Sequence, residues 1–158
     1  MARRLRIYLS RLTRLLALSL FALAPLAPAA VTDRVDIAPT KTSIYIGSVA
    51  MVMPPFERHG DRYESTYRAK VRPYFFASEH GTLAITVPAE SLQRLARGEA
   101  IEFEGEAYRD DGAKRGIAGR AVPIDASSGR IKVRVFITKH LELVFHTTYR
   151  FVGELKSG

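Results

Sequence analysis

Two rows of basic side chains are the residues of this sequence whose type and spacing are best suited to binding a ligand. The rows are Arg68, Lys70 and Arg72, and Arg130, Lys132 and Arg134. Alternate residues of a β-strand share a face, so each row presents its three charges together. On adjacent strands the rows would form a six-cation patch for phosphate or sulfate groups, with Tyr74 and Phe75 as stacking platforms at one edge.

Each of these features also has a purely structural interpretation. Charged outward rows keep exposed sheets and edge strands from aggregating. The aromatic residues 74–76 are more often part of a hydrophobic core than a ligand platform. The sequence therefore predicts that this aromatic segment belongs to the core, and anion binding by the two rows is a hypothesis.

Four histidines are candidate metal ligands and acid–base groups. Within one unbroken strand His140 and His146 would face the same way, but six residues would separate them by roughly 20 Å, too far for one ion. His59 and His80 lie in expected loops, where solvated side chains are more common than metal sites. The sequence has no zinc-protease, nucleophile-elbow, phosphate-loop or calcium-loop motif, so we expect no metal site and no cofactor.

Glu102, Glu104 and Glu106 form an acidic row on another expected strand. Their carboxylates would stand about 7 Å apart on one face, a spacing that also suits paired-carboxylate chemistry or a cation site. Lys114 and Arg120 lie on the strand expected beside them. Cross-strand ion pairs on a solvated face are therefore the favoured interpretation.

The elements that would position these residues are mostly strands. Apolar and polar residues alternate most regularly in residues 130–151, which predicts two consecutive strands. Their inward residues can face each other only if the connection has an odd number of residues. We therefore expect a three-residue loop centred on His140, a bulge near Phe136, or a corner between two sheets. A regular two-residue turn that pairs Thr138 with Leu141 would contradict this expectation.

The remaining chain predicts further strands and one helix. Strands are expected at residues 43–53, 63–72, 82–87, 100–108 and 114–124, with a loop at residues 57–62. Residues 88–98 predict the helix, since they begin with proline, end with glycine and place Leu92 and Leu95 on one stripe. The predicted fold is all-β with one short helix: an antiparallel β-sandwich or partly closed barrel of about seven strands.

The N-terminal residues have the pattern of an export signal. Five arginines precede an apolar run at residues 15–23, and Ala27-x-Ala29 is a small-residue cleavage site. The apolar run is shorter than the roughly 18 to 20 residues of a spanning helix, so we expect cleavage after Ala29 and no membrane span thereafter. The alternative is an uncleaved membrane anchor. The expected organisation is a signal peptide at 1–29, a leader at 30–42, a single β-domain at 43–152 and a tail at 153–158.

Charge and cysteine content limit the classes of partner. The formal charge of the whole chain is +8, but five of its 24 Lys and Arg residues lie in the expected signal. The rest of the chain has 19 basic and 16 acidic residues, a net charge of +3. This charge is too small to indicate a nucleic-acid partner by itself. The absence of cysteine excludes disulfides, thiolate metal sites and a cysteine-linked lipid anchor.

Together these features predict an exported, periplasmic or secreted, non-catalytic binding or interaction module of the cell envelope. Its ligand is open; an anionic glycan or lipid, or another envelope protein, would suit the basic rows. One alternative is an envelope hydrolase, which needs His59, His80 or His140 beside a carboxylate in a concave site. The other is a structural subunit that self-associates through an exposed edge strand.

Overall fold

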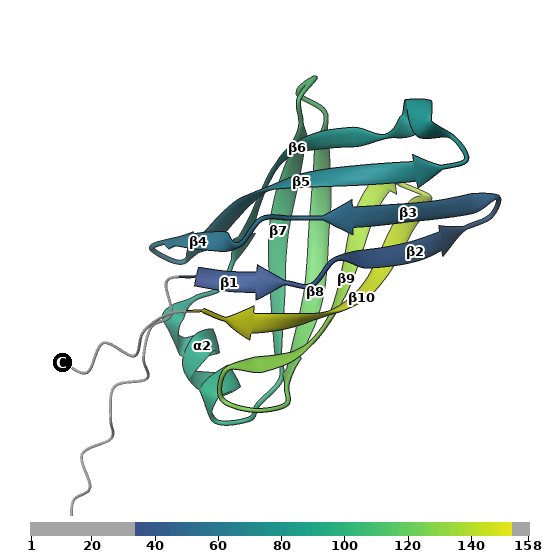
Figure 1. Cartoon of the computed structure of the whole chain (residues 1–158). Coiled ribbons are helices and arrows are strands. Elements are labelled where there is room, and N and C mark those ends of the chain that lie inside the picture. Colours follow the sequence, from purple (N-terminus) through teal and green to yellow (C-terminus); the bar gives the residue numbers. More distant parts are fainter. Residues whose placement is uncertain (1–33, 153–158) are drawn as a thin grey trace, which may run out of the picture.

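Antiparallel strands close into a barrel in the computed structural model, which describes residues 34–152 (Figure 1). The predicted all-β fold with one short helix is confirmed, and its architecture is a closed barrel. The expected signal peptide at 1–29, the first residues of the expected leader and the tail at 153–158 lie outside the described residues.

Ten strands, one α-helix and one 3₁₀ turn make up this part of the chain. The strands are β1 Arg34–Ile37, β2 Thr40–Ile44, β3 Gly47–Val52, β4 Phe56–His59, β5 Arg62–Arg72, β6 Glu79–Thr86, β7 Ile101–Arg109, β8 Lys114–Pro123, β9 Ser128–Thr138 and β10 Leu141–Phe151; the 3₁₀ turn η1 is Phe75–Ala77 and the helix α2 is Ala89–Ala96. From β5 onward, consecutive strands pair as a meander.

The ten strands form eight positions around the barrel because prolines interrupt two of them. Pro39 separates β1 from β2, and Pro54 and Pro55 separate β3 from β4. Proline lacks the N–H that a strand ladder needs. β4 pairs with β1, β3 pairs with β2, and both β3 and β4 pair with β5. The β5–β6 ladder and the β1–β10 ladder complete the ring.

The N-terminal part of the barrel differs from the prediction. The expected strand at residues 43–53 is instead a hairpin that turns at Tyr45 and Ile46. Its apolar residues occupy both odd and even positions because they belong to two different strands. β1 and the first residues of β2 lie in the expected leader at 30–42, and β4 lies in the expected loop at 57–62. Short strands beside prolines carry too few alternating residues to be distinguished from loops by pattern alone.

The connection between β9 and β10 combines a tight turn with a bulge. Thr138 pairs with Leu141 across a two-residue turn, so the expected three-residue loop is wrong. The register then shifts, Glu142 pairs with Phe136, and Ile137 is left as the extra residue. The bulge expected near Phe136 is therefore confirmed. It restores the parity that places the apolar residues of both strands inside the barrel.

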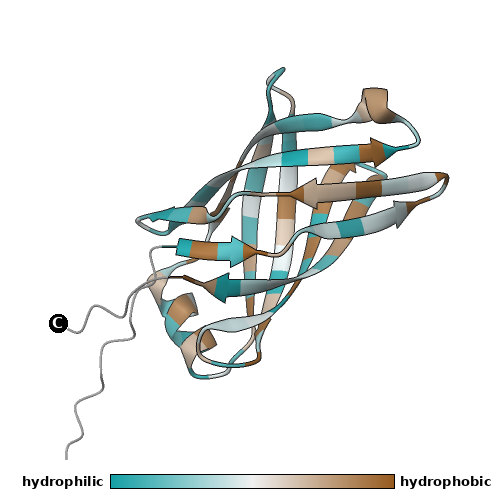
Figure 2. Ribbon diagram, viewed as in Figure 1, coloured by the Kyte–Doolittle hydropathy of each residue, from teal (hydrophilic) through white to brown (hydrophobic). Residues whose placement is uncertain are grey.

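One end of the barrel is covered by α2 and densely packed. The predicted helix is confirmed, and its Leu95 side chain is 5% exposed. Tyr63 in β5 is 1% exposed and is among the most deeply buried side chains of this end. Figure 2 shows apolar and polar residues alternating along the strands, as expected when one face of each strand points into the barrel. No helix within residues 34–152 is long and apolar enough to cross a bilayer.

Candidate ligand-binding cavity

The half of the barrel away from α2 encloses a cavity of about 530 Å³. Its wall consists almost entirely of aliphatic and aromatic side chains from the inward positions of the barrel strands. They include Ile44, Val49, Met51, Val71, Leu83, Ile85, Ile117, Val133, Val135, Ile137 and Leu143. Phe56, Phe103 and Phe145 form part of the same wall and are at most 8% exposed.

The cavity is hollow where inward side chains are small or β-branched. Ala69 and Ala107 are inward residues of β5 and β7, and both line the cavity. Tyr45, Ile46 and Leu141 also line it, and they come from the turns at the end of the barrel opposite α2. The cavity is therefore bounded on this side by exposed turns.

A cluster of four polar side chains lies in the wall of the cavity near these turns. Glu79 at the start of β6 accepts hydrogen bonds from Nε of Arg115 at 3.2 Å and from Nη2 of Arg115 at 2.9 Å. The Arg109 guanidinium donates to Glu79 at 3.5 Å, and the Tyr67 hydroxyl donates to it at 3.3 Å. The Glu79 and Arg115 side chains are only 17% and 13% exposed. The cluster is therefore a largely enclosed ion-pair group.

Its members are fixed in their charged or neutral forms by one another. Burial alone would raise the pKa of Glu79, but the hydrogen bonds and charge of Arg115 hold that pKa below its usual value. The Glu79 hydrogen bond and charge likewise raise the pKa of Arg115. Burial, together with the Glu79 carboxylate, raises the pKa of Tyr67 to about 12. At neutral pH the cluster contains a carboxylate, two guanidinium groups and a neutral phenol.

The β-bulge between β9 and β10 is connected to this cluster. A bulge leaves the extra residue without its ladder partners. Nη1 of Arg115 donates to the carbonyl oxygen of Ile137, the extra residue, at 3.2 Å. Arg115 thus satisfies a backbone acceptor and a carboxylate with the same planar group. The end of the β9–β10 hairpin and the start of β6 are held together from inside the barrel.

Two threonines beside the cavity have their hydroxyls engaged. Thr40 donates to the His146 carbonyl at 2.9 Å, and Thr147 donates to the Ala38 carbonyl at 2.7 Å. The Thr40 bond joins β2 to β10, a contact for which the described residues show no strand ladder, and the Thr147 bond joins β10 to Ala38 between β1 and β2. The hydroxyls therefore close the barrel where Pro39 interrupts the β1–β2 edge.

The structure places the two predicted basic rows on different sides of the barrel. Arg68, Lys70 and Arg72 lie outward on β5, and the Arg130, Lys132 and Arg134 row lies outward on β9. Three strands separate β5 from β9 in either direction around the ring. The single six-cation patch is therefore not formed, because the order of the strands sets its members on non-adjacent strands. Anion binding by either row alone stays a prediction.

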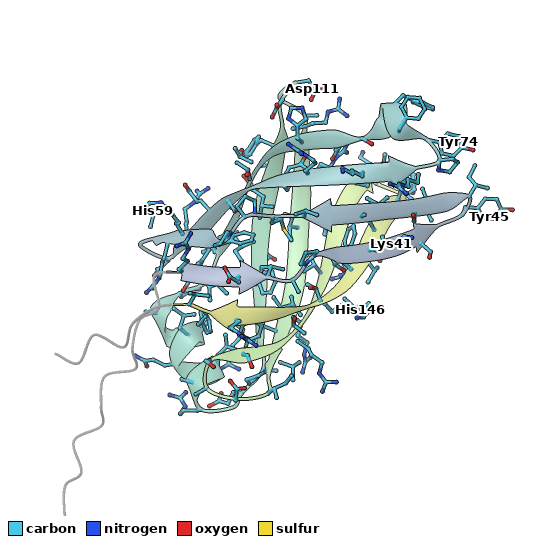
Figure 3. The ribbon with its side chains drawn as sticks, viewed as in Figure 1. Lys41, Tyr45, His59, Tyr74, Asp111 and His146 are labelled. Carbon is cyan, nitrogen blue, oxygen red and sulfur yellow. The ribbon has the colours of Figure 1, made fainter. Side chains whose placement is uncertain are left out.

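The aromatic residues predicted near the β5 row are not in the core. Phe75 and Phe76 are 80% and 78% exposed, and Tyr74 is partly exposed. Tyr74 and Phe75 each contact Phe76 edge to face, with ring centroids 5.7 Å and 6.2 Å apart. The expectation that residues 74–76 belong to the core is wrong, because Pro73 ends β5 and the chain leaves the barrel wall in η1. Tyr74 and Tyr45 lie at the same end of the barrel (Figure 3).

The four histidines are dispersed on the surface. All are exposed, and His59 and His146 lie in different regions of the barrel in Figure 3. Nδ1 of His80 lies 2.5 Å from the Asp110 carboxylate, but both side chains are more than half exposed. The described residues contain no group of three or more metal-ligating side chains. Among the described residues, the hydrolase alternative is left with the His80–Asp110 pair, which lines a surface groove outside the barrel cavity.

The acidic row on β7 lies on the outer surface, as its favoured interpretation predicted. Lys114 reaches Glu106 at 2.5 Å, and the Tyr108 hydroxyl donates to Glu106 at 2.7 Å. Glu102 is directly opposite Arg120 on β8. The Lys114–Glu106 pair is an exposed cross-strand ion pair of the kind that stabilises a sheet weakly, whereas Tyr108 and Glu106 are neighbours on the same strand.

Sequence reasoning did not identify the interior cluster. Arg115 alternates with Ile117 and Ala121, which point into the barrel. A charged residue at an inward position of a strand is the sequence signal that could have identified the cluster. Glu79 alternates with the inward residue Leu83, but it lies before the strand expected at residues 82–87, in a segment expected to be a loop. The register of the neighbouring strands β6, β7 and β8 brings these charges together on the inner face of the barrel.

Comparison of the chain with protein-family models, with curated proteins and with solved structures gave no significant match.

Proposed function

We propose that this chain is a non-catalytic binding protein that encloses one small apolar or amphipathic molecule within its barrel. The observation that carries the proposal is the cavity of about 530 Å³ with its apolar wall. Ligand pockets typically measure about 300 to 1,000 Å³, and a dry apolar cavity of about 150 Å³ suffices for benzene. A barrel of eight strands is just wide enough to hold one small ligand.

The interior cluster gives the bound molecule a preferred direction. Arg109 and Arg115 supply N–H donors and Tyr67 supplies a hydroxyl near one end of an otherwise apolar space. An amphipathic ligand gains most when its apolar part fills the aliphatic region and its hydroxyl, carbonyl or carboxylate meets these groups. This arrangement favours a lipid-like ligand over a glycan, whose many hydroxyls would be left without partners in the aliphatic region.

The proposal places the protein in the cell envelope. An N-terminal segment of signal type supports export to the periplasm or beyond, and a lipid-like ligand is available there. The barrel leaves few strand edges unpaired. Within residues 34–152, every strand except β2 pairs with a neighbour on both sides. A structural subunit that self-associates through an edge strand would therefore have little exposed edge to pair with.

A matched pair of substitutions tests the cavity as the binding site. Val133 lies in the cavity wall, whereas Val122 on the neighbouring strand is outward and 38% exposed. Val133→Trp inserts a large ring into the cavity, and Val122→Trp places the same ring on the outer surface. Uptake of a fluorescent fatty acid from aqueous solution, followed by its emission, should weaken about tenfold or more in Val133→Trp and stay unchanged in Val122→Trp.

Circular dichroism and urea unfolding establish that both variants are folded before uptake is compared. Failure of the wild-type protein to take up the fatty acid, or any other long-chain apolar probe such as a fluorescent alkyl alcohol, would disprove the proposal. Equal uptake by Val133→Trp and wild type would show that the probe binds outside the barrel.

A further inference from the structure

The turns around the open end of the cavity carry an unusual concentration of exposed apolar side chains. Tyr45 is 103% exposed, Ile46 58% and Leu141 51%, in addition to Phe75 and Phe76 of η1. We refer to these five residues as the apolar rim. They come from the β2–β3 turn, η1 and the start of β10. Leaving five large apolar side chains in water is unfavourable unless they contact a partner.

The parts of the apolar rim are close in space although they are far apart in the sequence. Ser48 pairs with Arg72, so the β2–β3 turn lies beside the end of β5 from which η1 continues. A Cβ added at Gly47 would lie only 2.0 Å from the carbonyl oxygen of Arg72, which shows how closely the two segments approach. Tyr45, Ile46 and Leu141 also line the cavity. These three residues of the apolar rim are therefore continuous with the cavity wall, and Phe75 and Phe76 follow the end of β5 beside the β2–β3 turn.

Positive charge lies next to the apolar rim. Phe75 shares a surface groove with Arg68, Lys70 and Arg72 of β5. Among the residues that the structure describes, these three cations have no carboxylate within ion-pair distance. The Glu79 carboxylate in the same groove is engaged by Arg115, and the nearby carboxylates of Asp110 and Asp111 are engaged by His80 and Arg109. The charge next to Phe75 is thus available to an anionic partner.

We propose that the open end of the barrel docks on a lipid bilayer that contains anionic headgroups. Aromatic side chains are favoured at the boundary between headgroups and acyl chains, and adjacent Lys and Arg residues are attracted to anionic lipid. Both features occur here on one surface, beside the opening of an apolar cavity. Docking itself needs only the apolar rim and the β5 cations; transfer of a lipid-like ligand between bilayer and cavity rests on the proposed function.

The absence of tryptophan from the sequence allows a local test in the full-length chain. Phe75→Trp places a single fluorophore on the apolar rim. Ile124→Trp is the matched control, because Ile124 is 64% exposed but lies between β8 and β9 at the α2 end of the barrel. Each variant is mixed with vesicles of phosphatidylcholine and phosphatidylglycerol in which the acyl chains are brominated, and quenching of its tryptophan is measured.

We expect the emission of Trp in Phe75→Trp to shift to the blue and to be quenched, whereas emission from Ile124→Trp stays that of an exposed ring. Adding Lys70→Glu and Arg72→Glu to the Phe75→Trp chain should reduce the quenched fraction severalfold. Vesicles of phosphatidylcholine alone should quench less. Both variants keep the full-length chain, and its first described strand begins at the α2 end near the β8–β9 loop of Ile124. Binding through the residues before β1 would therefore favour quenching of Ile124→Trp and could not imitate the expected result.

Two results would overturn the proposal. One is equal quenching, or none, at the two positions. The other is a blue shift of the Phe75→Trp chain that depends on protein concentration without vesicles, which would show that a second copy covers the apolar rim. Phe75→Ser with Phe76→Ser should still take up the fatty acid from aqueous solution. The vesicle test and the uptake test can therefore fail independently of each other.

Discussion

At the end of the barrel that α2 covers, Tyr63 and Leu95 are 1% and 5% exposed, and the inward side chains fill the space between the strands. Toward the opposite end, Val133 and Leu143 are only partly buried, because they face a cavity of about 530 Å³. The same alternation of inward and outward residues therefore produces a packed half and a hollow half. The difference is the size of the inward side chains and the presence of a helix over only one end.

The packed half also fits aromatic rings against glycines of the neighbouring strand. Tyr149 lies opposite Gly129, where an added Cβ would meet its ring at 2.5 Å. Phe103 lies opposite Gly119, where an added Cβ would meet its ring at 2.2 Å. In such pairs the aromatic ring occupies the space beside the glycine, where the neighbouring strand has no side chain. Phe103 thereby forms the boundary between the packed half and the cavity.

The first prediction compares the two halves by removing the same side chain from each. Leu95→Ala leaves a void in a close-packed site, so the free energy of unfolding should fall by about 3 kcal/mol. Leu143→Ala enlarges a space that is already open, so the loss should be about 1 kcal/mol. Urea unfolding of both variants measures the difference. Equal losses would mean that the surroundings of Leu143 are packed as densely as those of Leu95.

The second prediction concerns charge inside and outside the hollow half. Lys114 and Arg115 are consecutive residues of β8 that pair with Glu106 outside the barrel and Glu79 inside it. Glu79→Gln leaves the enclosed Arg115 without its carboxylate, so the free energy of unfolding should fall by about 2 kcal/mol. Glu106→Gln on the exposed face should be indistinguishable from wild type in urea unfolding.

The pH dependence of the Glu79→Gln effect provides its control. The pKa of Glu79 is lower in the folded chain than in the unfolded chain. Its stabilisation is therefore present above the unfolded-state pKa and is lost as the pH falls through the folded-state pKa. The difference between wild type and Glu79→Gln should shrink in strong acid. A difference that persists there would show that the substitution acts through packing.

The third prediction is the smallest and is confined to alkaline pH. Burial beside Glu79 raises the pKa of Tyr67 to about 12, from an ordinary value of 10.0. The unfolded chain thus loses this proton first, and the contribution of Tyr67 is present below pH 10 and lost as the pH rises toward 12. Urea unfolding between these pH values should show a shallower decline for Tyr67→Phe than for wild type. Tyr45→Phe, with its fully exposed ring, should follow wild type.

The sequence by itself determined the local pattern of this protein. Alternation over residues 63–72 and 130–151 predicted the longest strands, and proline and glycine at the ends of residues 88–98 predicted the helix. These signals are local, since each depends on the period of one element. The parity argument for β9 and β10 even required an irregular connection, and the bulge at Ile137 provides it.

Only the tertiary structure decided which residues meet. The order of the strands set the basic rows of β5 and β9 three strands apart, although each row was predicted to share a face. The register of the neighbouring strands β6, β7 and β8 brought Glu79, Arg109 and Arg115 together, and closure of the sheet enclosed the cavity beside them. Alternation specifies which side of a strand a residue occupies. Strand order, register and the volume left between inward side chains depend on contacts between segments far apart in the chain.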